Sequence, residues 1–188
     1  DLKAHTMTSR LPISLFLLIL ACTFGAQAAP NVVVSIKPIH SIVSNLMQGI
    51  GEPQLLLKSN ESAHSFHLRP SQASALEKAD LIISIDPHFE IGLANILSNY
   101  NNASQLIISQ LDLASLYVFR ETDESHNEDE SHNEGEHDYH LWLDIDNIRL
   151  IAKSASEHLS EIDQKNAVTY TKNLSILDTK LLQLHQNI

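Results

Sequence analysis

Two kinds of apolar pattern alternate along the chain after residue 30. Four short apolar runs, of which the first is rich in β-branched residues, predict strands at residues 32–36, 54–57, 81–85 and 105–109. Between them, apolar residues recur at helical spacing and predict helices over residues 39–48, 70–79 and 89–97. Because strands that alternate with helices form βαβ units, the sequence predicts an α/β fold with an open, mostly parallel sheet flanked by helices.

The second half of the chain begins with one more short apolar run and then becomes helical. Residues 139–143 predict a strand, and a helix is expected from Asp144 or Asp146 to Leu159. A last helix is expected from Asp163 to the end of the chain, about 25 residues or nearly 40 Å long. Since no stop signal follows it, we expect residues 161–188 to be the truncated start of a long helix that joins two lobes.

Residues 1–28 have the pattern of upstream residues followed by a secretory signal. Arg10 precedes an apolar segment at residues 11–21, which is shorter than the ~20 apolar residues of a membrane-spanning helix. Ala26-Gln27-Ala28 then matches a cleavage site, so we expect export with a cleaved signal and a mature chain from Ala29. A lipoprotein anchored at Cys22 and an uncleaved N-terminal anchor are the alternatives.

The composition fits an exported protein with a cationic ligand. The net charge is −11, which argues against nucleic acid or an anionic membrane surface as a partner. The single cysteine, Cys22, lies in the signal, so the mature chain has no disulfide and no thiolate metal site. Residues 29–160 are long enough for one N-terminal metal-binding lobe with its own core, and we expect a monomer.

An acidic, histidine-bearing loop occupies residues 120–138. Between Glu121 and Asp138 it holds nine carboxylates and no Lys or Arg, together with the imidazoles of His126, His132 and His137. Such a segment cannot bury itself, and imidazole beside carboxylate suits Zn²⁺. We expect these three histidines to collect metal at low affinity; a plain solvated linker is the alternative.

Other histidines follow the predicted strands. His40, His64 with His67, and His88 come after the first, second and third strand, where open α/β sheets bind ligands. We interpret His64 as a metal ligand. His40 and His88 are interpreted as ordinary loop residues or as residues that support a ligand.

Three motifs carry a family resemblance. Residues 62–71 read Ser-Ala-His-Ser-Phe-His-Leu-Arg-Pro-Ser, residues 79–82 read Ala-Asp-Leu-Ile, and residues 140–144 read His-Leu-Trp-Leu-Asp. In this order and spacing they resemble the solute-binding proteins of zinc and manganese ABC importers. The acidic histidine loop before the third motif is typical of the zinc-specific, ZnuA-type branch.

The resemblance implies a two-lobed α/β protein that holds its metal in the cleft between the lobes. It implies that His64 and His140 are metal ligands and that the remaining ligands lie in a C-terminal lobe missing from this chain. His67 and His40 are candidates for a metal-binding or supporting role. Ala63 stands where some zinc binders have a ligating Glu, and Ile145 replaces the family's usual Pro.

The function implied is capture of Zn²⁺ in the periplasm and delivery to the membrane permease of an ABC importer. A manganese-specific or adhesin-type member of the same family is one alternative. A secreted zinc hydrolase is another, but the sequence has no H-E-x-x-H motif, and Glu61 is the one carboxylate within three residues of His64. We therefore predict a binding protein with no catalytic residues, and not an enzyme.

Overall fold

The sheet of the protein is parallel, as the sequence predicts. The computed structural model describes residues 28–57, 68–97, 103–112 and 137–187. In these ranges four strands, β1 (Val32–Val34), β2 (Gln54–Leu55), β3 (Leu81–Ser84) and β4 (Ser104–Ile107), pair in the order β2-β1-β3-β4. All three pairings are parallel, so the strands end at one common edge.

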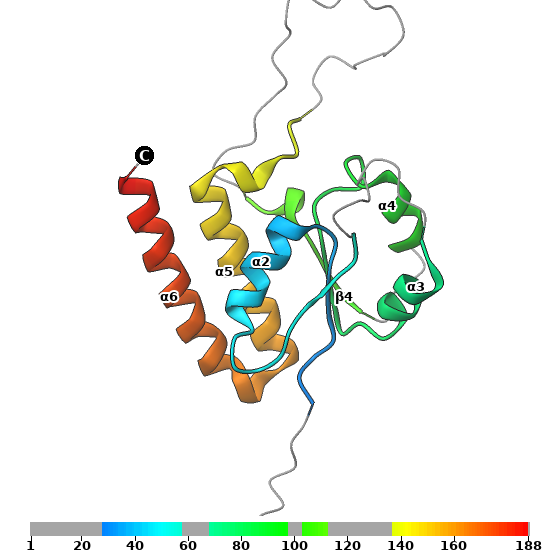
Figure 1. The fold of residues 1–188 in the computed structure, drawn as a ribbon, viewed down its shortest axis with the longest axis horizontal. Helices are drawn as coiled ribbons and strands as arrows, with labels where there is room; N and C mark the ends of the chain where they lie inside the picture. The colour runs from blue at the N-terminus through cyan, green and yellow to red at the C-terminus, as the bar shows by residue number, and fades with distance from the viewer. Residues whose placement is uncertain (1–27, 58–67, 98–102, 113–136, 188) are drawn as a thin grey trace, which may run out of the picture.

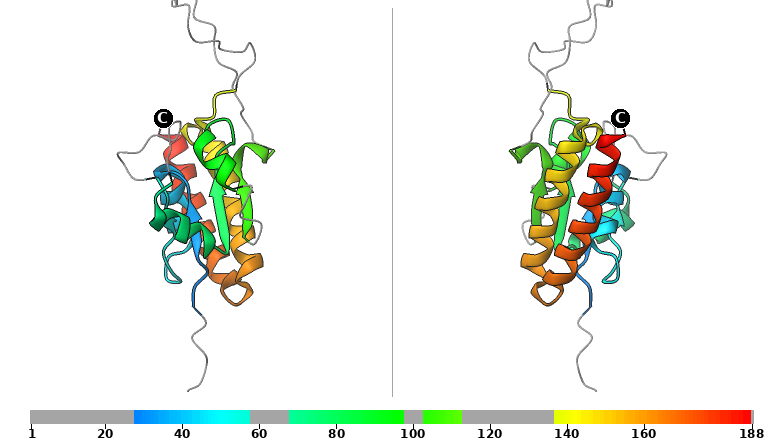
Figure 2. Two further views of the ribbon diagram at one scale, coloured as in Figure 1. Left: turned by 90° about the vertical axis from the view of Figure 1, so that its right-hand side faces the viewer. Right: turned by 90° about the vertical axis from the view of Figure 1, so that its left-hand side faces the viewer.

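Helices cover both faces of this sheet. Helices α2 (Lys37–Leu46), α5 (Ile145–Ile162) and α6 (Ala167–Gln186) lie on one side, and α3 (Pro70–Glu77) and α4 (Ile91–Leu97) lie on the other (Figure 1). Figure 2 shows α5 and α6 running side by side along the length of the sheet. The α/β architecture predicted from the alternating pattern is thus confirmed. No helix within the described ranges combines the length and apolarity that crossing a membrane requires.

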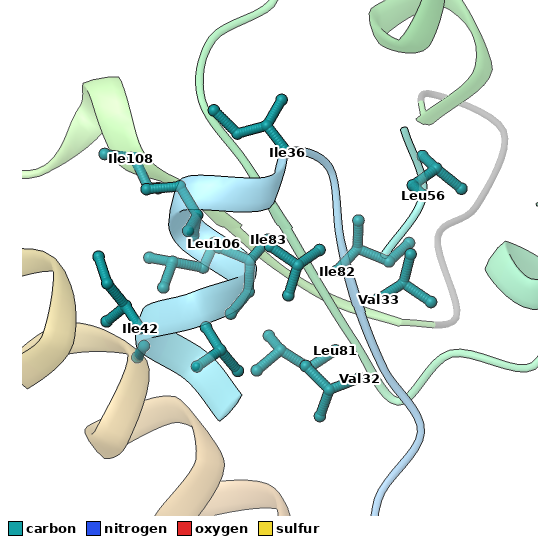
Figure 3. Packing of buried hydrophobic residues seen from close by; sticks show 14 of the residues in the cluster. Val32, Val33, Ile36, Ile42, Leu56, Leu81, Ile82, Ile83, Leu106 and Ile108 are labelled. Atoms are coloured by element: carbon teal, nitrogen blue, oxygen red, sulfur yellow. The ribbon is translucent and has the colours of Figure 1, made fainter. Parts of the chain in front are cut away.

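The two central strands are buried on both faces. Every residue of β1 and β3 is buried, which explains why their sequences are continuous apolar runs instead of alternating ones. Figure 3 shows Val33 and Ile82 near Leu56 on the side away from α2, while Ile83 lies beside that helix. The apolar stripe of α2 packs on the face of the sheet that carries Ile83, and its Ile39 is fully buried.

The strands are shorter than the apolar runs that predict them. The β2 ladder ends at Leu55, but Leu56 and Leu57 still donate backbone hydrogen bonds to the carbonyls of Val34 and Ser35, at 2.8 and 2.9 Å. Extended backbone therefore continues beyond the strand proper at this edge. Similarly, β4 passes directly into a 3₁₀ turn, η1 (Ile108–Gln110).

The prediction of a strand at residues 139–143 is wrong. Residues 141–143 form a 3₁₀ helix instead, η2 (Leu141–Leu143), in which the Leu143 N–H donates to the His140 carbonyl at 3.0 Å. The chain must enter α5 directly afterwards, because Asp144 Oδ1 accepts from the Asn147 N–H and caps that helix. A run of five residues that buries Leu141 therefore fits a turn as well as a strand. Of the two caps that the sequence leaves open, Asp144 and Asp146, the structure has Asp144.

The final helix is interrupted at its start. A 3₁₀ turn, η3 (Gln164–Asn166), precedes α6, which has 20 residues and is about 30 Å long. Tyr170 is fully buried, and its hydroxyl donates to Asp163 Oδ2 at 2.9 Å. Asn173 donates to the carbonyls of Leu46 and Gln48 at 2.8 and 2.9 Å, which fixes α6 against the end of α2. The joining of two lobes by this helix stays a prediction.

Candidate metal site

His140 lies at the carboxyl edge of the sheet and is held by its own neighbour. Asp138 Oδ1 accepts the His140 backbone N–H at 3.0 Å and lies 2.6 Å from His140 Nδ1. With Nδ1 donating to this carboxylate, the lone pair of the neutral ring is on Nε2, the arrangement seen in carboxylate–histidine–metal units. The side chain is 46% exposed, so the ring is fixed in orientation yet accessible to an ion.

The same contact perturbs Asp138. The His140 backbone N–H is the main cause that lowers the pKa of the Asp138 carboxyl, and the hydrogen bond to the ring also lowers it. The carboxylate is therefore ionised at neutral pH and keeps its hold on Nδ1.

Two aromatic rings, those of Phe89 and Trp142, pack against the His140 ring. The centroid of the His140 ring is 5.6 Å from that of Phe89, edge to face, and 5.2 Å from that of Trp142. Phe89 and Trp142 are themselves 5.8 Å apart in an edge-to-face arrangement. The three rings bring the turn after β3 together with the turn before α5, two segments about fifty residues apart in sequence.

The turn between β3 and α4 carries a second histidine held in the same way. Asp86 Oδ1 accepts the His88 backbone N–H at 2.6 Å and lies 2.9 Å from His88 Nδ1. Asp86 Oδ2 accepts from the Ser109 hydroxyl at 2.5 Å, which ties the turn to the end of β4. The His88 side chain is 76% exposed and its ring stacks on Tyr139, with centroids 6.4 Å apart.

His40 is turned toward the chain that enters β2. Its Nε2 lies 2.9 Å from the Pro53 carbonyl oxygen, and its Nδ1 lies 3.5 Å from the Ser44 hydroxyl. With Nε2 donating to a carbonyl, this ring locks the first turns of α2 to the start of β2. In this orientation neither nitrogen is directed to open solvent, and a metal-binding role for His40 stays a prediction.

His137 is the one loop histidine within the described residues. It forms an isolated β-bridge, and its Nδ1 is buried with no hydrogen-bond partner. His64, His67, His126 and His132 lie outside the described residues. Among residues 28–57, 68–97, 103–112 and 137–187, no three His, Cys, Asp or Glu side chains are grouped to hold a metal ion.

Sequence reasoning misses the residues that support His140. The sequence pattern places Asp138 in a loop and Phe89 at the first position of a helix, with no link from either to His140. A signal is present in the aspartate placed two residues before a histidine, which occurs at Asp86 and again at Asp138. Trp142 lies beside His140, partly buried against the core.

Comparison with known proteins places these features in a family. Residues 32–188 match the family described as "ZnuA: Zinc-uptake complex component A periplasmic". A high-affinity zinc uptake system protein ZnuA from Brucella abortus (strain 2308) is 32% identical over 189 residues, covering 84% of this chain and 57% of that protein. A protein with the same description from Yersinia pestis is 27% identical, covering 91% of this chain and 58% of that one. The chain spans about half the length of the curated relatives it matches.

Solved structures share the fold. An Mn-bound periplasmic metal-binding protein from Candidatus Liberibacter asiaticus superposes with a TM-score of 0.67 at 20% identity, covering 80% of this chain and 52% of that one. Zn(II)-bound AdcA from Streptococcus pneumoniae also superposes with a TM-score of 0.67, at 15% identity, covering 85% and 32%. None of these similarities supports a secreted zinc hydrolase.

Proposed function

Because this chain belongs to the family of periplasmic zinc-uptake components, we propose that its protein captures Zn²⁺ in the periplasm and delivers it to the membrane permease of an ABC importer. The observation that carries the proposal is the Asp138–His140 unit, which presents Nε2 at the carboxyl edge of a parallel sheet. Members of this family are metal-binding components of transport systems, and the family is not an enzyme family. We accordingly propose a binding protein without catalytic residues.

The proposed ligands from this part of the protein are His64 and His140. Two imidazoles favour a borderline cation such as Zn²⁺ over Mn²⁺, which prefers oxygen ligands; a manganese-specific member is the second candidate. His67 and His40 are proposed to bind the metal or to support a ligand. His126, His132 and His137 in the acidic loop are proposed to gather zinc at low affinity.

Reversible binding of Zn²⁺ then follows if each lobe supplies only part of the ligand set. Structural Zn²⁺ takes four ligands at about 2.0–2.3 Å, and residues beyond this chain are proposed to supply the ones that His64 and His140 do not. An ion that is bound from two lobes stabilises their closed arrangement, because only that arrangement offers all the ligands. Export by a cleaved signal, or a lipid anchor at Cys22, and a monomeric state are part of the same proposal.

Calorimetric zinc titration tests the assignment of the ligands. We expect His140→Ala and His64→Ala each to remove most of the zinc affinity, whereas His185→Ala, at an exposed position of α6, leaves it unchanged. Deletion of residues 121–136, which keeps Asp138, should lower the stoichiometry and spare the tight site. If the deletion removes tight binding while both substitutions leave it intact, the ligand assignment is reversed.

A further inference from the structure

Glu90 is a buried acid at the carboxyl edge of the sheet that the ligand assignment does not use. Its side chain belongs to the turn between β3 and α4 and is 2% exposed. Glu90 Oε2 accepts the Ile85 backbone N–H at 2.8 Å, and the Glu90 backbone N–H donates to the Asp86 carbonyl at 2.9 Å. Side chain and backbone thus both close the turn that carries His88 and Phe89.

The carboxyl group of Glu90 also lies near Ser35, the residue after β1. The Ser35 hydroxyl lies close enough to affect the carboxyl group, but Glu90 Oε1 and Ser35 Oγ are both buried without a well-formed hydrogen bond. Ser35 is 1% exposed, and its backbone N–H donates to the Ile83 carbonyl at 2.9 Å. A proton on Oε1 would give this pair a donor directed at Ser35, because Oε2 is already an acceptor.

Burial favours the protonated form of the Glu90 carboxyl group. Desolvation is the main cause that raises the pKa of Glu90 to about 7, and the neighbouring charge of Asp86 adds to it. The Ser35 hydroxyl and the Ile85 and Asp86 backbone groups oppose the shift. An acid in this setting is neutral in a large part of the molecules at neutral pH, and it joins β1 to the turn without an uncompensated buried charge.

Phe89 links the turn that Glu90 closes to His140. Phe89 directly precedes Glu90 and packs against both His140 and Trp142, at 5.6 and 5.8 Å. We propose that Glu90 is a positioning residue for His140, joining the end of β1 to the β3–α4 turn and so fixing the Phe89 ring on which His140 lies. It does not touch the metal. This inference rests on the proposed function only where zinc affinity is the measurement.

Trp142 allows a test without metal, because it is the single tryptophan of the chain. Glu90→Ala should shift its emission to the red and make it more accessible to acrylamide, while the matched exposed variant Glu77→Ala leaves both unchanged. Glu90→Gln should restore the wild-type spectrum, because the amide accepts from Ile85 and donates to Ser35. Ser35→Ala should show an intermediate change.

A pH profile separates this role from simple support of the fold. In wild-type protein the NMR signals of the His140 ring should show an additional step near pH 7 that Glu90→Gln lacks. In zinc titrations, Glu90→Ala should lose affinity by about tenfold, the lower end of the effect of residues that orient a ligand. If wild-type protein binds no zinc, the proposed function fails, while the Trp142 and His140 signals still decide the role of Glu90.

Two results would overturn the inference. One is a folded Glu90→Ala protein with unchanged Trp142 emission and unchanged His140 signals. The other is a Glu90→Gln protein as perturbed as Glu90→Ala. If Glu90→Ala does not fold, the Gln variant and Ser35→Ala decide: an unaltered His140 pH profile in both refutes the role.

Discussion

Removing the carboxylate of Asp138 should weaken zinc binding although Asp138 is not a proposed ligand. In Asp138→Ala the His140 ring loses the acceptor that lies 2.6 Å from Nδ1, and the His140 backbone N–H loses the same acceptor at 3.0 Å. The ring is then free to rotate, and its Nε2 lone pair is no longer fixed in tautomer or direction.

The size of the loss follows from this geometry. Partners that orient a metal-binding histidine typically contribute about 10–100-fold in metal affinity, or roughly 1.4–2.7 kcal/mol. The Asp138 side chain is 37% exposed, and solvent screening weakens an exposed ion pair, so we expect a value near the lower limit, about tenfold. Asp138→Asn keeps an oxygen acceptor but not the charge, and its loss should be smaller.

Competition titration with a chromophoric zinc chelator measures the effect. Asp178→Ala is the matched control, because the Asp178 carboxylate is 36% exposed, close to that of Asp138, but pairs with Arg149 instead of a histidine. The lowered pKa of Asp138 gives the sign of the pH dependence. Its contribution is complete above the usual value of 3.8 and is lost only as the pH falls through the lowered pKa. The Asp138 carboxylate should therefore support His140 throughout the range from about pH 6 to 8, and the affinity of Asp138→Ala should stay below that of wild type across it. Equal zinc affinity of wild type and Asp138→Ala, or a loss of the same size in Asp178→Ala, would refute the reasoning.

Two further predictions concern the placement of α6. Asn173→Ala removes two hydrogen bonds to the end of α2 and should lower the free energy of unfolding by about 1–2 kcal/mol in urea titration, whereas the exposed Asn187→Ala should change it little. Tyr170→Phe should cost about 1 kcal/mol at pH 7, because Asp163 keeps its bond to Asn166. Burial raises the pKa of Tyr170 above its usual 10, so the wild-type stability it provides is complete below pH 10 and declines at higher pH. If the unfolding free energy of Tyr170→Phe falls between pH 9 and 11 by as much as that of wild type, this reasoning is contradicted.

The sheet could be predicted because its sequence signals are local and strong. Val32–Val34 and Leu81–Ser84 are buried on both faces, and a short, mostly apolar run of this kind is typical of a central parallel strand. Their parallel pairing follows from the helices between them. The element at residues 139–143 could not be predicted in this way, because a short apolar run fits a strand or one turn of 3₁₀ helix. The nearby cap at Asp144 decides between them in the structure.

The candidate site could be predicted only in part for a related reason. A histidine at the end of a strand is visible in the sequence, and His140 is identified by its motif. The residues that orient it are not visible, because Phe89 reaches His140 only through the packing of two distant turns. Glu90 resembles any other helical glutamate in the sequence, and its burial emerges only when β1 and β3 lie side by side.

The two aspartate–histidine pairs show how far local sequence can specify a metal ligand. Asp86 with His88 and Asp138 with His140 have the same spacing and the same pair of hydrogen bonds, from backbone N–H and from Nδ1. The same spacing places a carboxylate oxygen against Nδ1 of both rings. Their surroundings differ: the His88 side chain is 76% exposed, whereas the His140 ring lies within 6 Å of two other aromatic rings. The His88 ring also has an aromatic neighbour, Tyr139, but at 6.4 Å. The His140 ring, with two closer aromatic neighbours, should lose less entropy on binding an ion. This difference in tertiary packing supports the proposal that His140, and not His88, is a metal ligand.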